Sequence, residues 1–216
     1  DLSGPNGLAT PNDIVKFSPL VPTAAGDSFE LFFDGSDVGL SGRDEQIDSL
    51  SVWLPEDFAP AAVGVPQDCT AGLLFITTAA NYRVRDANGV SMPGKGGDIL
   101  AFCATNLGPN TAGFWFRAFS ATEAGFSPLR AIRNLTVHNF AYNSGTGDWE
   151  LRFSFSSRTD FHMGAFTGYA NNVYLMDTTA GDPILELDLN TDYPTLNGSA
   201  DGLEIVPYTS VCANDC

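Results

Sequence analysis

Acidic side chains cluster in one short stretch of the chain, between residues 34 and 48. Calcium binds roughly six to eight oxygen atoms, and short Asp side chains on a glycine-containing turn can converge on one ion because glycine tolerates positive φ. The stretch therefore predicts a structural Ca²⁺ site with ligands from Asp34, Asp37, Asp44 and Asp48. The competing interpretation is turn chemistry, in which Asp34 and Asp37 accept hydrogen bonds from nearby backbone amides and no metal is needed.

Two aromatic residues flank a short polar loop and are the candidates for contact with a ligand. Tyr142 and Trp149 stand on either side of residues 143–148, which have the composition of a hairpin loop. Exposed aromatic rings stack on the faces of sugars, so this pair predicts a carbohydrate contact. The competing interpretation is that an aromatic residue on a strand belongs to the core, as most do.

Motifs for catalysis are scarce in the sequence. The histidines are His138 and His162, each without a second histidine nearby in the sequence, and a structural role is the better interpretation for both. There is no GxSxG elbow, no HExxH motif and no phosphate-binding glycine loop. A pair of carboxylates for glycoside hydrolysis can be assembled from 26 acidic residues in many ways, so it carries no information. We therefore expect a protein that is not an enzyme.

The four cysteines predict disulfides, because an even count in a chain with other secreted features is typical of oxidising compartments. Cys69 precedes one expected strand and Cys103 lies near the end of another. If these strands pair antiparallel, the start of one faces the end of the other, which predicts a Cys69–Cys103 bridge. Cys212 and Cys216 would close a small C-terminal loop, or would link to another chain.

Composition limits the class of partner. Acidic residues outnumber basic ones by 26 to 10, for a net charge of −16, so nucleic acid and anionic membranes are poor partners. The hydrophobic fraction of 44% and the 16 phenylalanines argue against a disordered chain. No apolar run approaches the roughly 18–20 residues that span a bilayer, and no leader peptide is evident. We expect a mature, secreted, extracellular protein.

Short apolar runs bounded by Gly, Pro, Asn and Asp follow one another along the chain, which predicts an all-β fold. The expected architecture for the single domain, residues 1–216, is an antiparallel β-sandwich, with a propeller-like arrangement as the alternative. The expected strands are Ile14–Ser18, Ser28–Asp34, Ile47–Leu54, Leu73–Thr78, Tyr82–Arg85, Ile99–Ala104, Phe114–Ser120, Ile132–His138, Glu150–Ser156, Val173–Met176, Ile184–Leu189 and Leu203–Val206.

The chain also matches itself at a spacing of roughly 85 residues. The match predicts repeats over about 13–97 and 98–181 and a truncated copy over 182–216. The aligned segments are Asp13–Phe17 with Asp98–Phe102 and Asp182–Leu187, Phe29–Leu40 with Trp115–Phe126, Ile47–Val52 with Ile132–Val137, and Leu73–Val84 with Leu151–Met163. A truncated copy can leave a strand edge that must be covered or used for association.

The phrases FELFFDGSDVGLSGRDEQIDSLSVW and GGDILAFCATNLGPNTAGFWFRAF resemble a tandem repeat of large secreted bacterial surface proteins. The most specific piece, Phe33–Leu40, is intact in the first copy, whereas the second carries Ser120 in place of Asp34 and Glu123 in place of Asp37. The resemblance implies an extracellular, β-rich protein and assigns no catalytic residues. Asn134 and Asn197 begin glycosylation sequons, but a bacterial type of repeat favours the absence of a glycan.

These observations predict a secreted, non-catalytic β-repeat protein with a structural, surface, matrix or self-assembly role. Its expected partner is another copy of itself or a cell-surface or matrix component. One alternative is a carbohydrate-binding module that binds a glycan with calcium-ordered loops. The other is a metal-dependent hydrolase that uses acidic residues as metal ligands and bases.

Overall fold

The computed structural model describes residues 3–4, 7–18, 28–55, 58, 68–129, 132–146, 148–157 and 159–188 of the chain. Within these ranges the regular structure is β-strand, apart from two short 3₁₀ helices, η1 (Ser36–Val38) and η2 (Arg43–Glu45). The all-β prediction is confirmed.

Seventeen strands, β1 to β17, are described. Each expected strand on described residues is present within a few residues of its predicted ends, and Leu203–Val206 lies outside them. The strands not predicted are short or carry a proline: β1, β2, β8, β11, β14 and β15. The strands are β1 (Ser3–Gly4), β2 (Gly7–Leu8), β3 (Ile14–Ser18), β4 (Ser28–Phe33), β5 (Ile47–Trp53), β6 (Gly72–Thr78), β7 (Tyr82–Arg85), β8 (Ser91–Gly94), β9 (Ile99–Asn106), β10 (Ala112–Phe119), β11 (Phe126–Ser127), β12 (Arg133–Asn143), β13 (Asp148–Ser156), β14 (Phe161–Met163), β15 (Phe166–Gly168), β16 (Val173–Asp177) and β17 (Ile184–Leu187).

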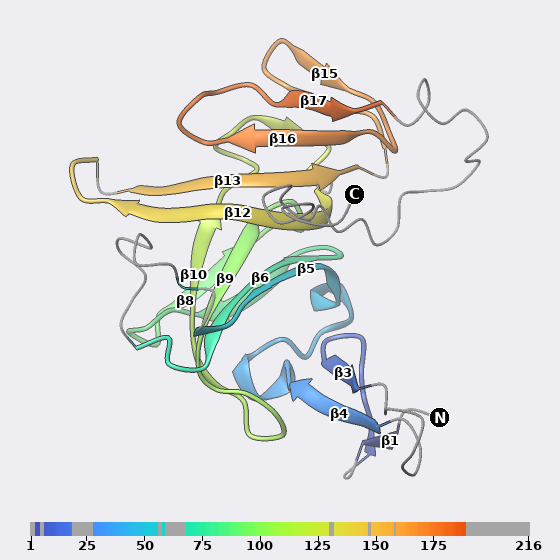
Figure 1. Ribbon diagram of the computed structural model, residues 1–216, viewed down its shortest axis with the longest axis vertical. Helices are drawn as coiled ribbons and strands as arrows, with labels where there is room; N and C mark the ends of the chain where they lie inside the picture. The colour runs from blue at the N-terminus through green and yellow to red at the C-terminus, as the bar shows by residue number, and fades with distance from the viewer. Residues whose placement is uncertain are drawn as a thin grey trace, which may run out of the picture.

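Two four-stranded antiparallel sheets form most of the molecule. The first has the strand order β10-β9-β6-β5 and the second has the order β12-β13-β16-β17. The β3–β4 hairpin forms a two-stranded sheet of its own, and smaller sheets are β11-β14-β15, β7-β8 and β1-β2. Figure 1 shows these parts as an open stack, with β3–β4 at one end, the first sheet in the middle and the second sheet at the other end. The arrangement is sandwich-like, as predicted.

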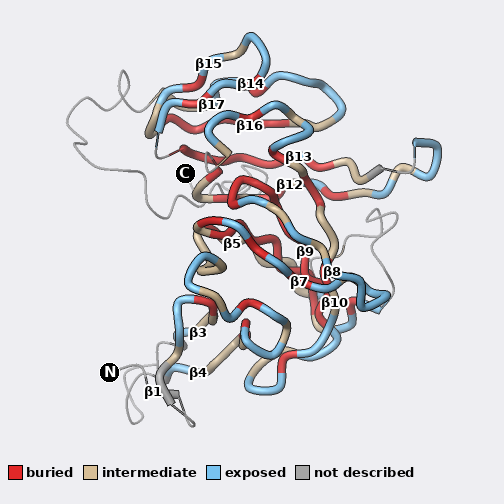
Figure 2. The backbone as a smooth tube through the Cα atoms, turned by 180° about the vertical axis from the view of Figure 1, so that it is seen from behind, coloured by how far each residue is buried: buried red, intermediate tan, exposed pale blue. Residues whose placement is uncertain are grey.

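The middle sheet is covered on both faces, and this explains its composition. Leu74 and Ile76 of β6 pack into a core shared with β3–β4, whereas Leu73 and Phe75 pack into the core shared with the second sheet. All residues of β6 are therefore buried, and its sequence GLLFITT lacks the alternation of a half-exposed strand. Figure 2 shows buried backbone in both large sheets, while β3 and β4 are mostly intermediate or exposed.

The predicted Cys69–Cys103 disulfide is confirmed. Strands β6 and β9 pair antiparallel with Leu73 opposite Cys103, so Cys69, just before β6, reaches the end of β9. The two Cα atoms are 4.7 Å apart and both side chains are buried. Cys212 and Cys216 lie outside the described residues.

Strand pairing shifts one of the sequence matches. In the first sheet β9 lies between β6 and β10, and in the second sheet β16 lies between β13 and β17. In the second sheet, β16 (Val173–Asp177) therefore takes the position that β9 has in the first sheet. The sequence match had instead aligned Ile184–Leu187, which is β17, with β9. The sequence match rested on a short apolar run after an aspartate, which is a weak signal for an equivalent strand. The strand order of the second sheet is decided by the pairing of β13 with β16, which is more buried than β17.

Among the described residues no helix is both long enough and apolar enough to cross a bilayer.

Candidate functional site

The acidic turn after β4 is closed by its own hydrogen bonds. The Asp34 carboxylate accepts from the backbone amide of Ser36 at 3.0 Å and from its hydroxyl at 2.7 Å. The amide of Leu40 donates to the carbonyl oxygen of Gly35 at 2.8 Å, and Gly39 has a φ of 94°, which glycine adopts without steric cost. Asp34 therefore acts as a turn residue, as the competing interpretation of the sequence expects.

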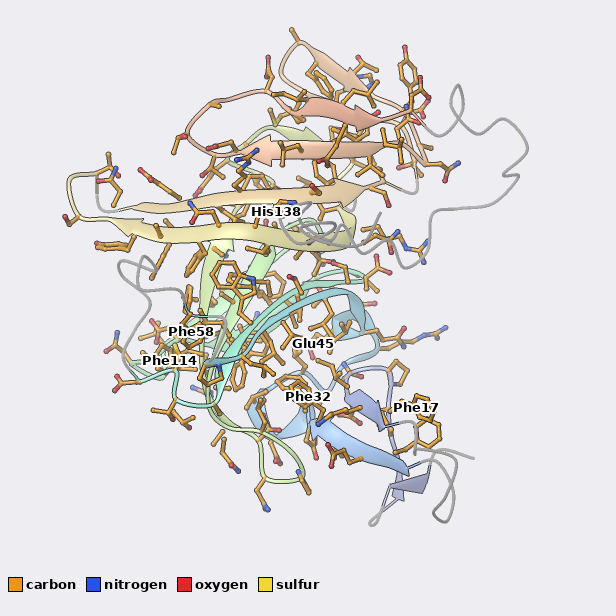
Figure 3. The ribbon with its side chains drawn as sticks, in the orientation of Figure 1. Phe17, Phe32, Glu45, Phe58, Phe114 and His138 are labelled. Carbon is orange, nitrogen blue, oxygen red and sulfur yellow. A yellow bond between two sulfur atoms is a disulfide. The ribbon has the colours of Figure 1, made fainter. Side chains whose placement is uncertain are left out.

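Two of the other acidic side chains of this stretch, Glu45 and Asp48, point to separate partners. Glu45 accepts from the amides of Ser41 and Gly42 through Oε2 and from the amide of Arg83 through Oε1 (labelled in Figure 3). Asp48 pairs with Arg133 at 3.5 Å. Within the described ranges no three His, Cys, Asp or Glu side chains come together as a metal-binding group. The Ca²⁺ site at Asp34, Asp37, Asp44 and Asp48 stays a prediction.

The turn after β10 shares two backbone hydrogen bonds with the turn after β4, those donated by the glycine and by the residue that follows it. The Phe126 amide donates to the Ala121 carbonyl at 2.9 Å, and Gly125 has a φ of 74°. In place of Asp34, Ser120 accepts from the amide of Glu123 through its hydroxyl at 3.3 Å. Both turns bury the apolar residue that follows the glycine, Leu40 in one and Phe126 in the other. The turn geometry is thus independent of Asp34.

An aspartate just before each hairpin anchors the turn that follows the hairpin. Asp13 Oδ1 accepts from the amide of Gly35 at 3.0 Å, and Asp98 Oδ1 accepts from the amide of Ala121 at 2.9 Å. Each aspartate also accepts through Oδ2 from the amide three residues earlier in the chain, that of Thr10 or Lys95. Asp13 and Asp98 occupy matching positions in the sequence repeat, although the sequence predicts no role for either. This match is the sequence signal that could have identified them as equivalent anchors.

Asp98 is buried, and a network of polar groups surrounds its carboxylate. The side chain is 2% exposed. Its Oδ2 accepts from the Tyr82 hydroxyl at 2.9 Å and lies 3.5 Å from Nε of Arg117. Arg117 Nε also donates to the Tyr82 hydroxyl at 3.0 Å. Burial raises the pKa of Tyr82, and the charge of Asp98 raises it further, so the phenol stays protonated and can donate to the carboxylate. The network joins β7, β9 and β10.

The predicted ligand residues Tyr142 and Trp149 lie together on the β12–β13 hairpin, with ring centroids 5.1 Å apart. Trp149 stacks on Phe140 at 4.4 Å and on Phe116 at 4.9 Å. Because the centroids of Phe116 and Phe140 are themselves only 5.7 Å apart, both rings lie on the same side of the indole. With Tyr142 as a third neighbouring ring, the indole of Trp149 is half-buried.

Trp149 also lines a cleft of about 500 Å³ between the ends of the two large sheets. The cleft combines apolar side chains with hydrogen-bonding groups. Its lining includes Arg117, Ser120, Glu123, Met163, Met176 and Asp182.

His138 belongs to a polar cluster on the second sheet (labelled in Figure 3). Its Nε2 lies 2.8 Å from Oγ of Ser154, and that hydroxyl donates to Oε2 of Glu186 at 2.7 Å. Because the one Ser154 proton points to the carboxylate, the Nε2–H of His138 donates to Ser154. The serine bridges the histidine and the acid here, whereas in a catalytic triad the histidine bridges the serine and the acid. The geometry supports the structural role predicted for His138.

Acid should weaken this cluster. Burial lowers the pKa of His138, partly offset by the charge of Glu186, so the unfolded chain takes up a proton at a higher pH than the folded protein does. Stability is then expected to fall as the pH drops below about 6.5, the unfolded value. We expect urea midpoints at pH 7.5 and 5.5 to differ less in His138→Gln than in the wild type. The control is His162→Gln, at an exposed position on β14. Equal pH dependence in His138→Gln and the wild type would contradict the assignment.

One of the two predicted glycosylation sites is described. The Asn134 amide donates to Oγ of Ser156 at 2.8 Å, and the residue is half-buried with a φ of 46°. A glycan on this nitrogen would displace that hydrogen bond. Asn197 lies outside the described residues.

No family model, curated protein or solved structure matches the chain. The resemblance to tandem repeats of secreted bacterial surface proteins stays an expectation from sequence.

Proposed function

We propose that the chain is a secreted, non-catalytic protein of repeated β units, with a structural role that depends on association between like units. The observation that carries this proposal is the recurrence of one construction at two places. In each, an aspartate precedes a hairpin and anchors the turn after it, through Asp13 and Gly35 in one and through Asp98 and Ala121 in the other. Tandem units of this kind bury their apolar faces by stacking on one another.

Two further features support an extracellular structural role. The Cys69–Cys103 disulfide is of a kind that persists in oxidising compartments. The net charge of −16 gives a surface suited to an extracellular medium and opposes binding to nucleic acid. Calcium bound at the acidic turn that contains Asp34 remains part of the proposal, as a modulator of association.

The proposed function is tested by the mass of the chain in solution. Light scattering over a range of protein concentrations, in excess Ca²⁺ and again in EDTA, should show reversible association. Assemblies that dissociate in EDTA would support both the structural role and the calcium site. Assemblies in both buffers would support the structural role without the metal. A monomer in both buffers at every concentration would contradict the proposed function.

The cleft at Trp149 favours a second candidate, a carbohydrate-binding module. The supporting observation is a half-buried indole that lines the cleft together with Arg117, Glu123 and Asp182. If this is the function, Trp149→Ala should reduce retention on a bound polysaccharide by about tenfold or more, because ring stacking is lost. The control is Tyr169→Ala, an exposed tyrosine outside the cleft lining. A polysaccharide panel with no retention, with or without Ca²⁺, would exclude this candidate.

A further inference from the structure

The hairpins β3–β4 and β9–β10 are built alike. In each, the two strands pair antiparallel, and two aromatic residues stand opposite each other. Phe17 faces Phe29 in the first hairpin, with ring centroids 4.9 Å apart, and Phe102 faces Trp115 in the second, with centroids 4.7 Å apart.

The surroundings of these two aromatic pairs differ sharply. Phe102 and Trp115 are 0% and 1% exposed, in the core between the first sheet and β3–β4. Phe17 and Phe29 are 48% and 53% exposed. Figure 3 shows Phe17 beside β3 at the periphery of the molecule. Two adjacent, half-exposed phenylalanines on one short hairpin form an apolar patch that a monomer does not use.

The strand edges of the two hairpins differ in the same way. Strand β9 pairs with β10 on one side and with β6 on the other, so its hairpin is half of a four-stranded sheet. Strand β16 is likewise flanked by β13 and β17. Among the described residues β3 pairs only with β4. On the edge of β3 that faces away from β4, the backbone N–H and C=O groups therefore have no neighbouring strand among the described residues. On the corresponding edges, β9 and β16 each pair with a further strand.

We propose that this edge and the Phe17–Phe29 patch bind the same hairpin of a second copy of the chain. The inference rests on the proposed function and names the surface through which like units associate. Antiparallel pairing of β3 with β3 of the second copy gives a sheet of order β4-β3-β3-β4. That sheet has the width of the two large sheets in the chain. A two-fold axis places the same surface on both partners, and such self-complementary contacts are the usual basis of dimers.

The charges of the hairpin permit this contact. Lys16 is the one charged residue of β3, and it pairs with Glu30 of its own hairpin at 3.2 Å. A lysine on an edge strand discourages pairing when its charge is unmatched, and here the partner carboxylate lies beside it. The net charge of −16 opposes the approach of two copies at long range. Added salt should therefore strengthen the dimer, since it screens that repulsion.

Sedimentation equilibrium of the full chain, at several concentrations and at low and high salt, tests the proposal. The double variant Phe17→Ser, Phe29→Ser should raise the dissociation constant of the dimer by about tenfold or more, because the apolar patch is lost. The control is Val90→Ser, Tyr169→Ser, which removes two equally exposed apolar side chains elsewhere. It should leave the dissociation constant unchanged. Near-UV circular dichroism identifies any variant that is not folded, and the single variant Phe17→Ser then replaces it.

Three results would overturn the proposal in distinguishable ways. Association that persists unchanged in the double variant would exclude this surface while leaving self-association in place. Association weakened equally in the double variant and the control would exclude it as well. A monomer under all conditions would overturn both this inference and the proposed function.

Discussion

Replacement of Asp98 by alanine is expected to lower the free energy of unfolding by roughly 3 kcal/mol or more, because a buried carboxylate that accepts several hydrogen bonds is lost. The amides of Lys95 and Ala121 and the hydroxyl of Tyr82 all lose their acceptor. Arg117 loses the carboxylate at 3.5 Å. Unpaired buried donors cost more than the hydrogen bonds themselves contributed. The measurement is a urea or guanidinium unfolding curve at neutral pH.

The matched control is Asp13→Ala at the corresponding anchor of the other turn. Asp13 makes the same bonds to Gly35 and Thr10, but it is only half-buried, so water can replace the carboxylate. We expect Asp13→Ala to lower the free energy of unfolding by about 1 kcal/mol. If both substitutions cost the same, burial of Asp98 is not what makes its network important.

The substitution Trp115→Ala should lower the free energy of unfolding by a similar amount, roughly 3–5 kcal/mol. The ring is 1% exposed, lies 4.7 Å from that of Phe102 and 6.2 Å from that of Phe33, and its indole N–H donates to the carbonyl of Val38 at 2.8 Å. Truncation therefore opens a cavity and also releases η1 of the acidic turn. Since domains of this size are only marginally stable, the loss is readily measured by thermal or chemical unfolding.

The corresponding position in the first hairpin provides the comparison. Phe29→Ala, measured at a dilution where the chain is monomeric, is expected to cost less than about 1 kcal/mol because the ring is 53% exposed. At concentrations where the proposed dimer forms, the cost should rise with protein concentration. A large loss at high dilution would show that Phe29 already packs within one molecule.

Much of the fold follows from local patterns in the sequence. The apolar run of β6 and the alternating Tyr82–Arg85 are sufficient to define strands, and the order of two strands is sufficient to predict Cys69–Cys103. The short strand β14 is set by its pairing with β11 and β15, and neither β14 nor β15 gives a periodic signal. The place of Ile184–Leu187 depends on which strand pairs with β13, and this is a property of the whole sheet.

The candidate site was less accessible to sequence reasoning. The acidic residues from 34 to 48 are close along the chain, but two 3₁₀ helices direct Glu45 and Asp48 to different partners. Asp98 is the opposite case, because an ordinary aspartate before a strand becomes the centre of a buried network through residues up to 23 positions away. Pattern alone cannot show burial of that kind, although the repeated Asp-Ile pair at 13 and 98 marked the position.

Hydrogen exchange of the β3 amides that point away from β4 tests the proposed association most directly. These amides should exchange fast in dilute solution and become protected as the chain concentration rises, while the amides of β6 stay protected throughout. That result would show that the edge of the first hairpin gains a partner strand by association. The opposite result is exchange of these β3 amides at a rate that does not depend on concentration, although light scattering shows association under the same conditions. That result would contradict the claim that like units join through this hairpin.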